Sequence, residues 1–122
     1  MALATNLPPD ILKAMEREGR LNVGQFDGSN LQYLVFNTSS GPLANVKVRQ
    51  AIGYAVDRQK IITELLSDQA KIAPSILPTQ SWAFSPGKSY SYDPAKAKQL
   101  LQEAGYKNEP ITFKFRAGSA AV

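Results

Sequence analysis

One segment, residues 45–66 (NVKVRQAIGYAVDRQKIITELL), constrains the fold more than any other part of this sequence. Its apolar residues recur mostly at spacings of three and four, which places them on one face of a helix: Val48, Ile52, Ala55, Val56, Ile62 and Leu66. Asn45 is a preferred N-cap residue, and Asp57 is a short carboxylate of the kind that helix interiors disfavour. We therefore predict a core helix that begins after Asn45 and bends or restarts at Asp57.

Gly53 is a second soft point in this helix, because glycine in a helix interior costs about 1 kcal/mol relative to alanine. An isolated glycine inside a helical pattern often has a packing reason. We predict that the missing side chain of Gly53 admits a neighbouring element.

Two arginines of this helix, Arg49 and Arg58, lie nine positions apart and so face roughly the same side of a continuous helix. Two guanidinium groups on one side can hold an anion. We favour a structural interpretation, in which Arg58 pairs with Glu64 or with a neighbouring element and Arg49 lies on a solvated face.

A short helix and three strands are predicted outside this segment. Pro8 and Pro9 begin the helix, and Gly19 ends it in the left-handed conformation. Residues 21–26 and 31–37 are predicted strands joined by a loop, and the second has apolar residues on both alternating faces, as a strand buried on both faces does. Residues 111–116 alternate apolar and polar, which predicts a half-buried strand.

A helix of residues 94–104 is predicted from its end signals. Asp93 is its N-cap, Pro94 occupies its first position, and Gly105 ends it, with Tyr106 folding back on the last turn in a Schellman-type stop. Its buried stripe is predicted to be Ala97, Leu100, Leu101 and Ala104.

Residues 70–92 are rich in proline and serine and are predicted to form a long ordered loop with at most one short strand. Trp82 and Phe84 lie in this loop, and loop aromatics often line binding clefts. The favoured alternative is that they anchor the loop to the core. Tyr90 and Tyr92 precede the next helix and are interpreted as structural.

Helices alternate with the predicted strands, and no internal repeat recurs. This pattern predicts an α/β fold, with α+β possible, in which a mixed sheet is covered by helices. A length of 122 residues is that of one domain.

Several kinds of chemistry are excluded by composition. The sequence has neither histidine nor cysteine, which removes imidazole bases, thiolate nucleophiles and the commonest metal ligands. Its carboxylates are explained as helix caps or exposed helix faces, and no glycine-rich phosphate loop follows a strand. The net charge of +4 is spread over every segment, which favours a solvated surface over nucleic-acid binding. We predict neither enzymatic activity nor a cofactor.

Three motifs in order resemble family 5 of the extracellular solute-binding proteins, which serve peptide, nickel and related ABC importers. They are the run VRQAIGYAVDR followed by II, the upstream stretch LQYLVFNTSSGPLANVKVRQA and the downstream stretch YSYDPAKAKQLLQEAGY, so the resemblance covers residues 21–115. Gly53 departs from the polar or larger residue common in the family.

The resemblance implies a two-lobed clamp several times longer than this chain, of which residues 1–122 are a single partial domain, a fragment of one lobe. It implies the substrate-binding component of an ABC importer for oligopeptides or dipeptides, with a membrane permease as partner and a periplasmic or cell-surface location. Gly118, Ser119 and Trp82 are the ligand-binding residues that it suggests. The motif residues assigned a structural role are Arg49, Asp57, Arg58, Asp93 and Gly105.

Further expectations follow from the resemblance and from the ends of the chain. The chain begins Met-Ala without a long apolar run, so we expect neither a signal peptide nor a membrane span in it. One alternative is the solute-sensing lobe of a transcriptional regulator, and an unrelated small enzyme is another, which the lack of His and Cys disfavours. A lobe fragment should also expose apolar surface, so we predict a homodimer formed through residues 111–116 or 70–92.

Overall fold

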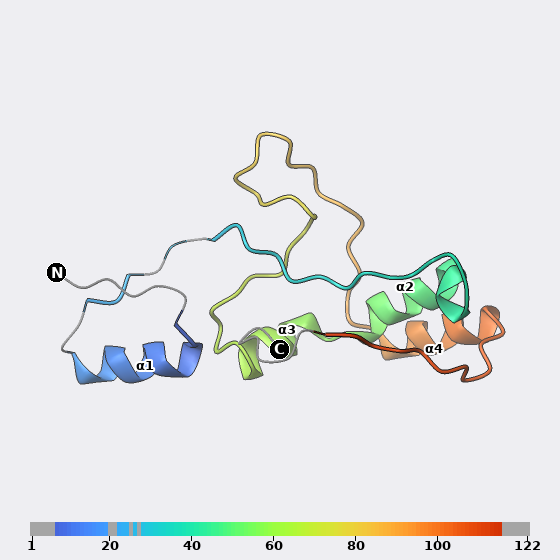
Figure 1. Ribbon diagram of the computed structural model, residues 1–122, viewed down its shortest axis with the longest axis horizontal. Helices are drawn as coiled ribbons and strands as arrows, with labels where there is room; N and C mark the ends of the chain where they lie inside the picture. The colour runs from blue at the N-terminus through green and yellow to red at the C-terminus, as the bar shows by residue number, and fades with distance from the viewer. Residues whose placement is uncertain (1–6, 20–21, 25, 27, 116–122) are drawn as a thin grey trace.

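The structure is a computed structural model that describes residues 7–19, 22–24, 26 and 28–115. Its elements are the helices α1 (Pro9–Glu18), α2 (Val46–Ala55), α3 (Arg58–Glu64) and α4 (Pro94–Glu103), with a short 3-10 helix, η1 (Pro42–Ala44), before α2. Figure 1 shows α2 and α4 side by side, and η1 packs against α2. α1 lies away from this pair and packs against no other element that the structure describes.

The predicted restart of the central helix at Asp57 is confirmed. The side chain of Asn45 accepts a hydrogen bond from the backbone N–H of Lys47 at 2.9 Å and so caps α2. α2 ends at Ala55, and the carboxylate of Asp57 accepts from the backbone N–H of Lys60 at 2.9 Å to cap α3. Each cap satisfies an amide that the first turn of a helix leaves without a partner.

This cap gives a testable expectation for Asp57. We expect Asp57→Ala to lower the free energy of unfolding of α3 by about 1 kcal/mol, the usual cost of a lost N-cap. Asp57→Asn should cost much less, because its side-chain oxygen still accepts from Lys60. Backbone chemical shifts along 58–64 measure the helix content of each variant. Equal shifts for the alanine and asparagine variants would show that the carboxylate does not hold α3.

Small side chains form the contact between α2 and α4. Ala51, Ala97 and Leu100 are 1%, 4% and 7% exposed and form one cluster, against which Tyr54 and Leu101 pack. The predicted stripe of α4 is therefore confirmed at its centre. On the central helix, Val48 is buried as predicted, but Ala55 is exposed and Ala51 is the buried alanine. Ala55 is the last residue of α2, whereas Ala51 forms one cluster with Ala97 and Leu100 of α4.

Both predicted glycine stops are confirmed. Gly105 has φ 64°. The N–H of Tyr106 donates to the carbonyl of Leu101 at 3.1 Å, and the N–H of Gly105 donates to the carbonyl of Gln102 at 3.0 Å. This pair of bonds is a Schellman motif. Gly19 follows α1 with φ 64°.

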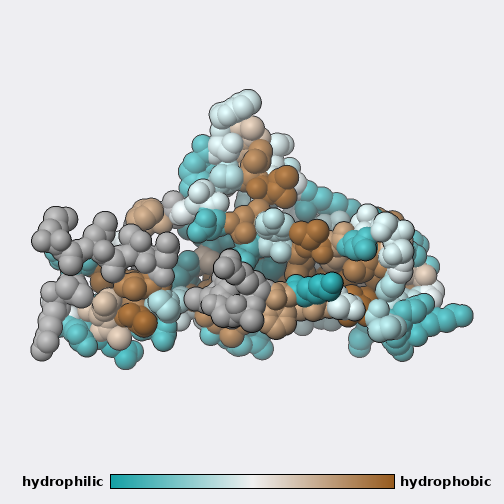
Figure 2. All heavy atoms as spheres, viewed as in Figure 1, coloured by the Kyte–Doolittle hydropathy of each residue, from teal (hydrophilic) through white to brown (hydrophobic). Residues whose placement is uncertain are grey.

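No residue that the structure describes lies in a strand. Tyr33 and Val35, in the segment predicted to be buried on both faces, are 71% and 80% exposed, and Phe113 is 66% exposed. A strand needs a neighbour for its backbone hydrogen bonds, and within the described chain these segments have none. The mixed sheet therefore stays a prediction, whereas the predicted exposure of apolar surface is confirmed. Figure 2 shows such apolar side chains on one face of the molecule.

Candidate functional site

A long loop joins α3 to α4 and rises away from the helices (Figure 1). The N–H of Gly87 donates to the carbonyl of Pro74 at 2.9 Å and closes the segment 74–87, which we call the Trp82 loop. Two turns form its tip. The N–H of Ser81 donates to the carbonyl of Pro78 at 2.9 Å, and the N–H of Phe84 donates to the carbonyl of Ser81 at 3.0 Å. The prediction of an ordered loop is confirmed, and the described residues of this loop contain no short strand.

Trp82 is the most exposed large side chain of the Trp82 loop. It is 98% exposed, and Ile76 is 82% exposed, whereas Phe84 is half-buried. The favoured interpretation that Trp82 anchors the loop to the core is therefore wrong. The two successive turns fix the backbone on either side of Trp82, so the internal shape of the loop does not depend on a tryptophan anchor. The role of Trp82 as a ligand contact stays a prediction.

The stem of this loop is fastened to α2 at Gly53. A Cβ atom at Gly53 would lie 3.2 Å from Cγ of Tyr90, so the ring of Tyr90 occupies the space that a side chain would fill. The same ring meets Tyr54 edge to face, with 5.1 Å between ring centroids. The N–H of Asp93 donates to the carbonyl of Tyr54 at 2.9 Å. The predictions for Gly53 and Tyr90 are confirmed, whereas Tyr92 is 54% exposed and shows no anchoring contact among the described residues.

Two parts of the structural interpretation of the arginine pair are wrong: Arg49 does not lie on a solvated face, and Arg58 does not pair with Glu64. Nη1 of Arg49 donates to the carbonyls of Leu43 and Ala44 at 2.8 and 2.9 Å, so this half-buried side chain fastens η1 to α2. The helix break places Arg49 in α2 and Arg58 in α3, so the two arginines do not lie on one continuous helix. Glu64 lies 3.7 Å from Lys60, its neighbour at the i,i+4 spacing, and pairs with that lysine rather than with Arg58.

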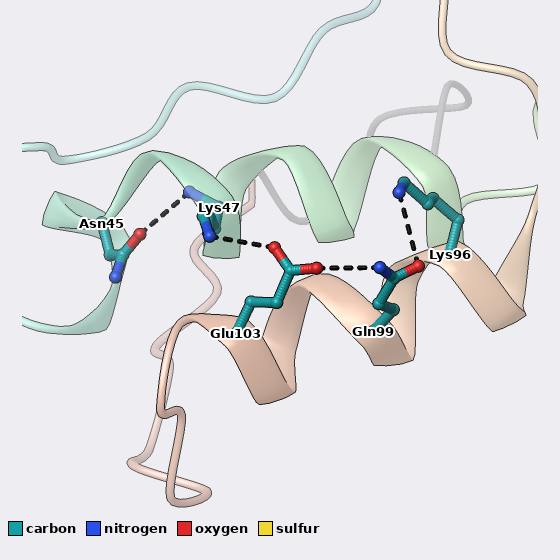
Figure 3. A network of polar contacts seen from close by, with 5 residues as sticks. All are labelled: Asn45, Lys47, Lys96, Gln99 and Glu103. Carbon is teal, nitrogen blue, oxygen red and sulfur yellow. Dashed lines mark hydrogen bonds and ion pairs between the residues drawn. The ribbon is translucent and has the colours of Figure 1, made fainter.

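Polar side chains bridge the outer edge of the α2–α4 pair (Figure 3). One carboxylate oxygen of Glu103 accepts from Nζ of Lys47 at 2.9 Å, and the other accepts from Nε2 of Gln99 at 2.8 Å. Lys96 donates to Gln99 at 3.4 Å. The bond from Lys47, followed by that from Gln99, holds the pKa of Glu103 below its ordinary value of 4.5. The i,i+4 spacing of Gln99 and Glu103 is visible in the sequence, but the contact with Lys47 is not.

The lowered pKa of Glu103 predicts a pH dependence. The unfolded chain has the ordinary pKa of 4.5, so the stabilisation from Glu103 is present above that pH and is lost as the pH falls through the lower folded-state pKa. We expect Lys47→Met to return the pKa of Glu103 toward 4.5, since Lys47 is the largest cause of the shift. Lys98→Met, on the exposed side of α4, is the matched control. A carboxyl carbon titration by NMR measures this pKa, and equal midpoints in both variants would contradict the assignment.

A shallow hollow of about 360 Å³ lies where the start of α2 meets the end of α4, lined by Gly41, Pro42, Ala44, Asn45, Val48, Ala104, Gly105, Tyr106 and Glu109. Glu109 is already engaged there, because its carboxylate accepts from the N–H of Lys107 and its carbonyl from Oη of Tyr106. Within the described ranges, no acidic side chains cluster as metal ligands would, and the helices are too short or too polar to cross a membrane. The predicted ligand residues Gly118 and Ser119 lie outside the described residues.

Comparison with known proteins decides the family. The profile described as "Bacterial extracellular solute-binding proteins, family 5 Middle" matches residues 2–121, nearly the whole chain. The chain belongs to this family. This match confirms the family resemblance described for residues 21–115, because the matched range contains all of them.

Curated relatives of this family 5 chain are much longer than it is. It is 42% identical over 98 residues to "Heme-binding protein A" of Haemophilus influenzae and 38% identical over 99 residues to the "Dipeptide-binding protein" of Escherichia coli, each match covering 80% of this chain and 18% of the relative. A "Probable ABC transporter periplasmic-binding protein SapA" of Escherichia coli is 36% identical over 104 residues, covering 84% of this chain and 19% of the relative. The chain therefore spans under a fifth of the length of these relatives. No solved structure gives a significant match.

Proposed function

We propose that this chain is part of the substrate-binding component of an ABC importer that captures dipeptides or oligopeptides outside the cytoplasmic membrane and delivers them to a membrane permease. The observation that carries the proposal is the family match over residues 2–121. Relatives named for dipeptide or di/tripeptide binding, with 34–38% identity, support peptides as the solute. A periplasmic or surface location is part of the same proposal.

Most of the described residues have a structural role in this proposed function. The α2–α4 pair forms the rigid part, because its small buried side chains and capped ends fix two helices together. The Trp82 loop extends from that pair and carries the candidate ligand contact Trp82. Gly118 and Ser119 are proposed as further contacts at the end of the chain. A binding role of this kind needs no catalytic group, and we propose none.

Calorimetry on the protein encoded by the complete gene tests this function. We expect a dissociation constant in the micromolar range or tighter for some member of a panel of di- to pentapeptides, and none for hemin, the ligand class suggested by the name of the Haemophilus influenzae relative. Tight binding of hemin without binding of any peptide would replace the proposed solute. Binding of neither would overturn the proposal.

The isolated chain of 122 residues is expected not to bind peptides tightly. Trp82 has open solvent around it, so a peptide would find few contacting groups in this segment. We expect no heat of binding for any di- to pentapeptide at micromolar concentrations. A micromolar dissociation constant for the isolated chain would show that the binding groups all lie within it.

A further inference from the structure

The Trp82 loop combines an exposed tip with a packed stem. The loop exposes Trp82 at its tip and Ile76 nearer its base, although large apolar side chains are normally among the most buried in a protein. The stem is packed, with the ring of Tyr90 filling the space above Gly53. Binding residues often lie on loops that a packed scaffold holds in position, and Trp82 lies on a loop with such a packed base.

Four contacts define the stem, and each is made by a residue that lies between the closing bond of the Trp82 loop and the first turn of α4. Tyr90 sits on Gly53 and against the edge of Tyr54, and the N–H of Asp93 donates to the carbonyl of Tyr54 at 2.9 Å. Nζ of Lys88 lies 5.6 Å from the centroid of the Tyr90 ring, over its face. The half-buried ring of Tyr90 thus contacts α2 at Gly53 and Tyr54 and has Lys88 of its own segment over its face.

We propose that Tyr90, seated on Gly53, is a positioning residue that holds the Trp82 loop in place so that Trp82 packs against an apolar side chain of the bound peptide. The role of Trp82 in this statement rests on the proposed function, whereas the role of Tyr90 in holding the loop does not. The charge of the loop fits such an occupant: residues 70–92 contain two lysines and no carboxylate, so nothing in them repels the carboxylate end of a peptide.

Spin-label distances in the chain of 122 residues test the positioning role. The sequence has no cysteine, so Ala83→Cys near the tip and Ala95→Cys on α4 give one labelled pair at two exposed positions. We expect a single narrow distance distribution in the parent chain and a loss of that narrow population in Tyr90→Ala. Tyr90→Phe should restore it, because the contacts are made by the ring. Tyr92→Ala, at a half-exposed tyrosine two positions away, is the matched control and should leave the distribution narrow.

A second variant separates loss of position from loss of folding. Gly53→Leu fills the space under Tyr90 with a residue that favours helices more than glycine does, so α2 keeps its helix content while the ring is displaced. We expect unchanged far-ultraviolet circular dichroism and a broadened distance distribution. A distribution as narrow as that of the parent in both Gly53→Leu and Tyr90→Ala would overturn the positioning role.

The solute contact is tested in the protein encoded by the complete gene, with alanyl-phenylalanine and alanyl-alanine as probes. We expect Trp82→Ala and Tyr90→Ala each to weaken binding of alanyl-phenylalanine more than that of alanyl-alanine. We also expect Tyr90→Ala to cause no further loss once Trp82 is alanine, because Tyr90 acts through Trp82. If the two substitutions together weakened binding by the sum of their separate effects, Tyr90 would not act through Trp82. If neither dipeptide binds the parent protein, the proposed contact with Trp82 fails, and the distance measurements still decide whether Tyr90 holds the loop.

Discussion

Replacing Leu100 with alanine should lower the free energy of unfolding of the α2–α4 pair by about 2–5 kcal/mol, the range for truncating a buried leucine. Leu100 is 7% exposed and forms one cluster with Ala51 and Ala97. Those two neighbours are alanines, so they have no longer side chains with which to fill the cavity. The loss should therefore fall toward the upper end of that range.

Leu65→Ala is the matched control, because it makes the same chemical change at a leucine that is 69% exposed. It should change the free energy of unfolding little. Urea unfolding followed by circular dichroism measures both variants. Equal midpoints for Leu100→Ala and Leu65→Ala would mean that the contact between α2 and α4 does not hold this part of the chain together.

The opposite change, Ala97→Leu, should also destabilise the pair. Ala97 is 4% exposed at the contact with α2, and extra methylenes in a packed interior cost about 1–3 kcal/mol. The added side chain has to push α4 away from Ala51, which is 1% exposed. The N–H of Asp93 should then lose its bond to the carbonyl of Tyr54 and exchange with solvent faster.

Ala95→Leu on the same helix is the control for this prediction, because Ala95 is exposed. Leucine and alanine have similar helix propensities, so this variant should keep the parent stability. Amide hydrogen exchange at Asp93 and urea unfolding give two independent measurements. If Ala97→Leu matched Ala95→Leu in both, α2 and α4 would have room between them that the structure does not show.

The helix ends could be predicted from the sequence because each of them depends on local chemistry. Asn45, Asp57 and Asp93 each accept a bond from an amide two or three positions later, and Gly105 adopts a positive φ in its own turn. The packing of a neighbouring element on Gly53 could also be predicted, because a glycine destabilises a helix interior and such packing offsets the loss. The identity of the compensating ring could not, because Tyr90 reaches Gly53 only after the chain has passed through the whole Trp82 loop.

Each error concerns a backbone contact that the pattern of side chains in the sequence does not show. Arg49 was placed on a solvated face because a helical wheel does not show that the carbonyls of η1 turn toward it. Trp82 does not anchor its loop to the core, because backbone hydrogen bonds between loop residues set the shape of the loop. The strand predictions for 31–37 and 111–116 depend on neighbours that supply backbone hydrogen bonds, and the described residues place no strand beside either segment.

The proposed function places this family 5 chain in a protein that captures peptides. Native mass spectrometry of the protein encoded by the complete gene, purified without added ligand, tests this function. We expect a fraction of molecules to carry one bound peptide, which denaturation releases and fragmentation identifies. A protein that is free of ligand in every preparation and gains no mass when di- to pentapeptides are added would contradict the proposed function.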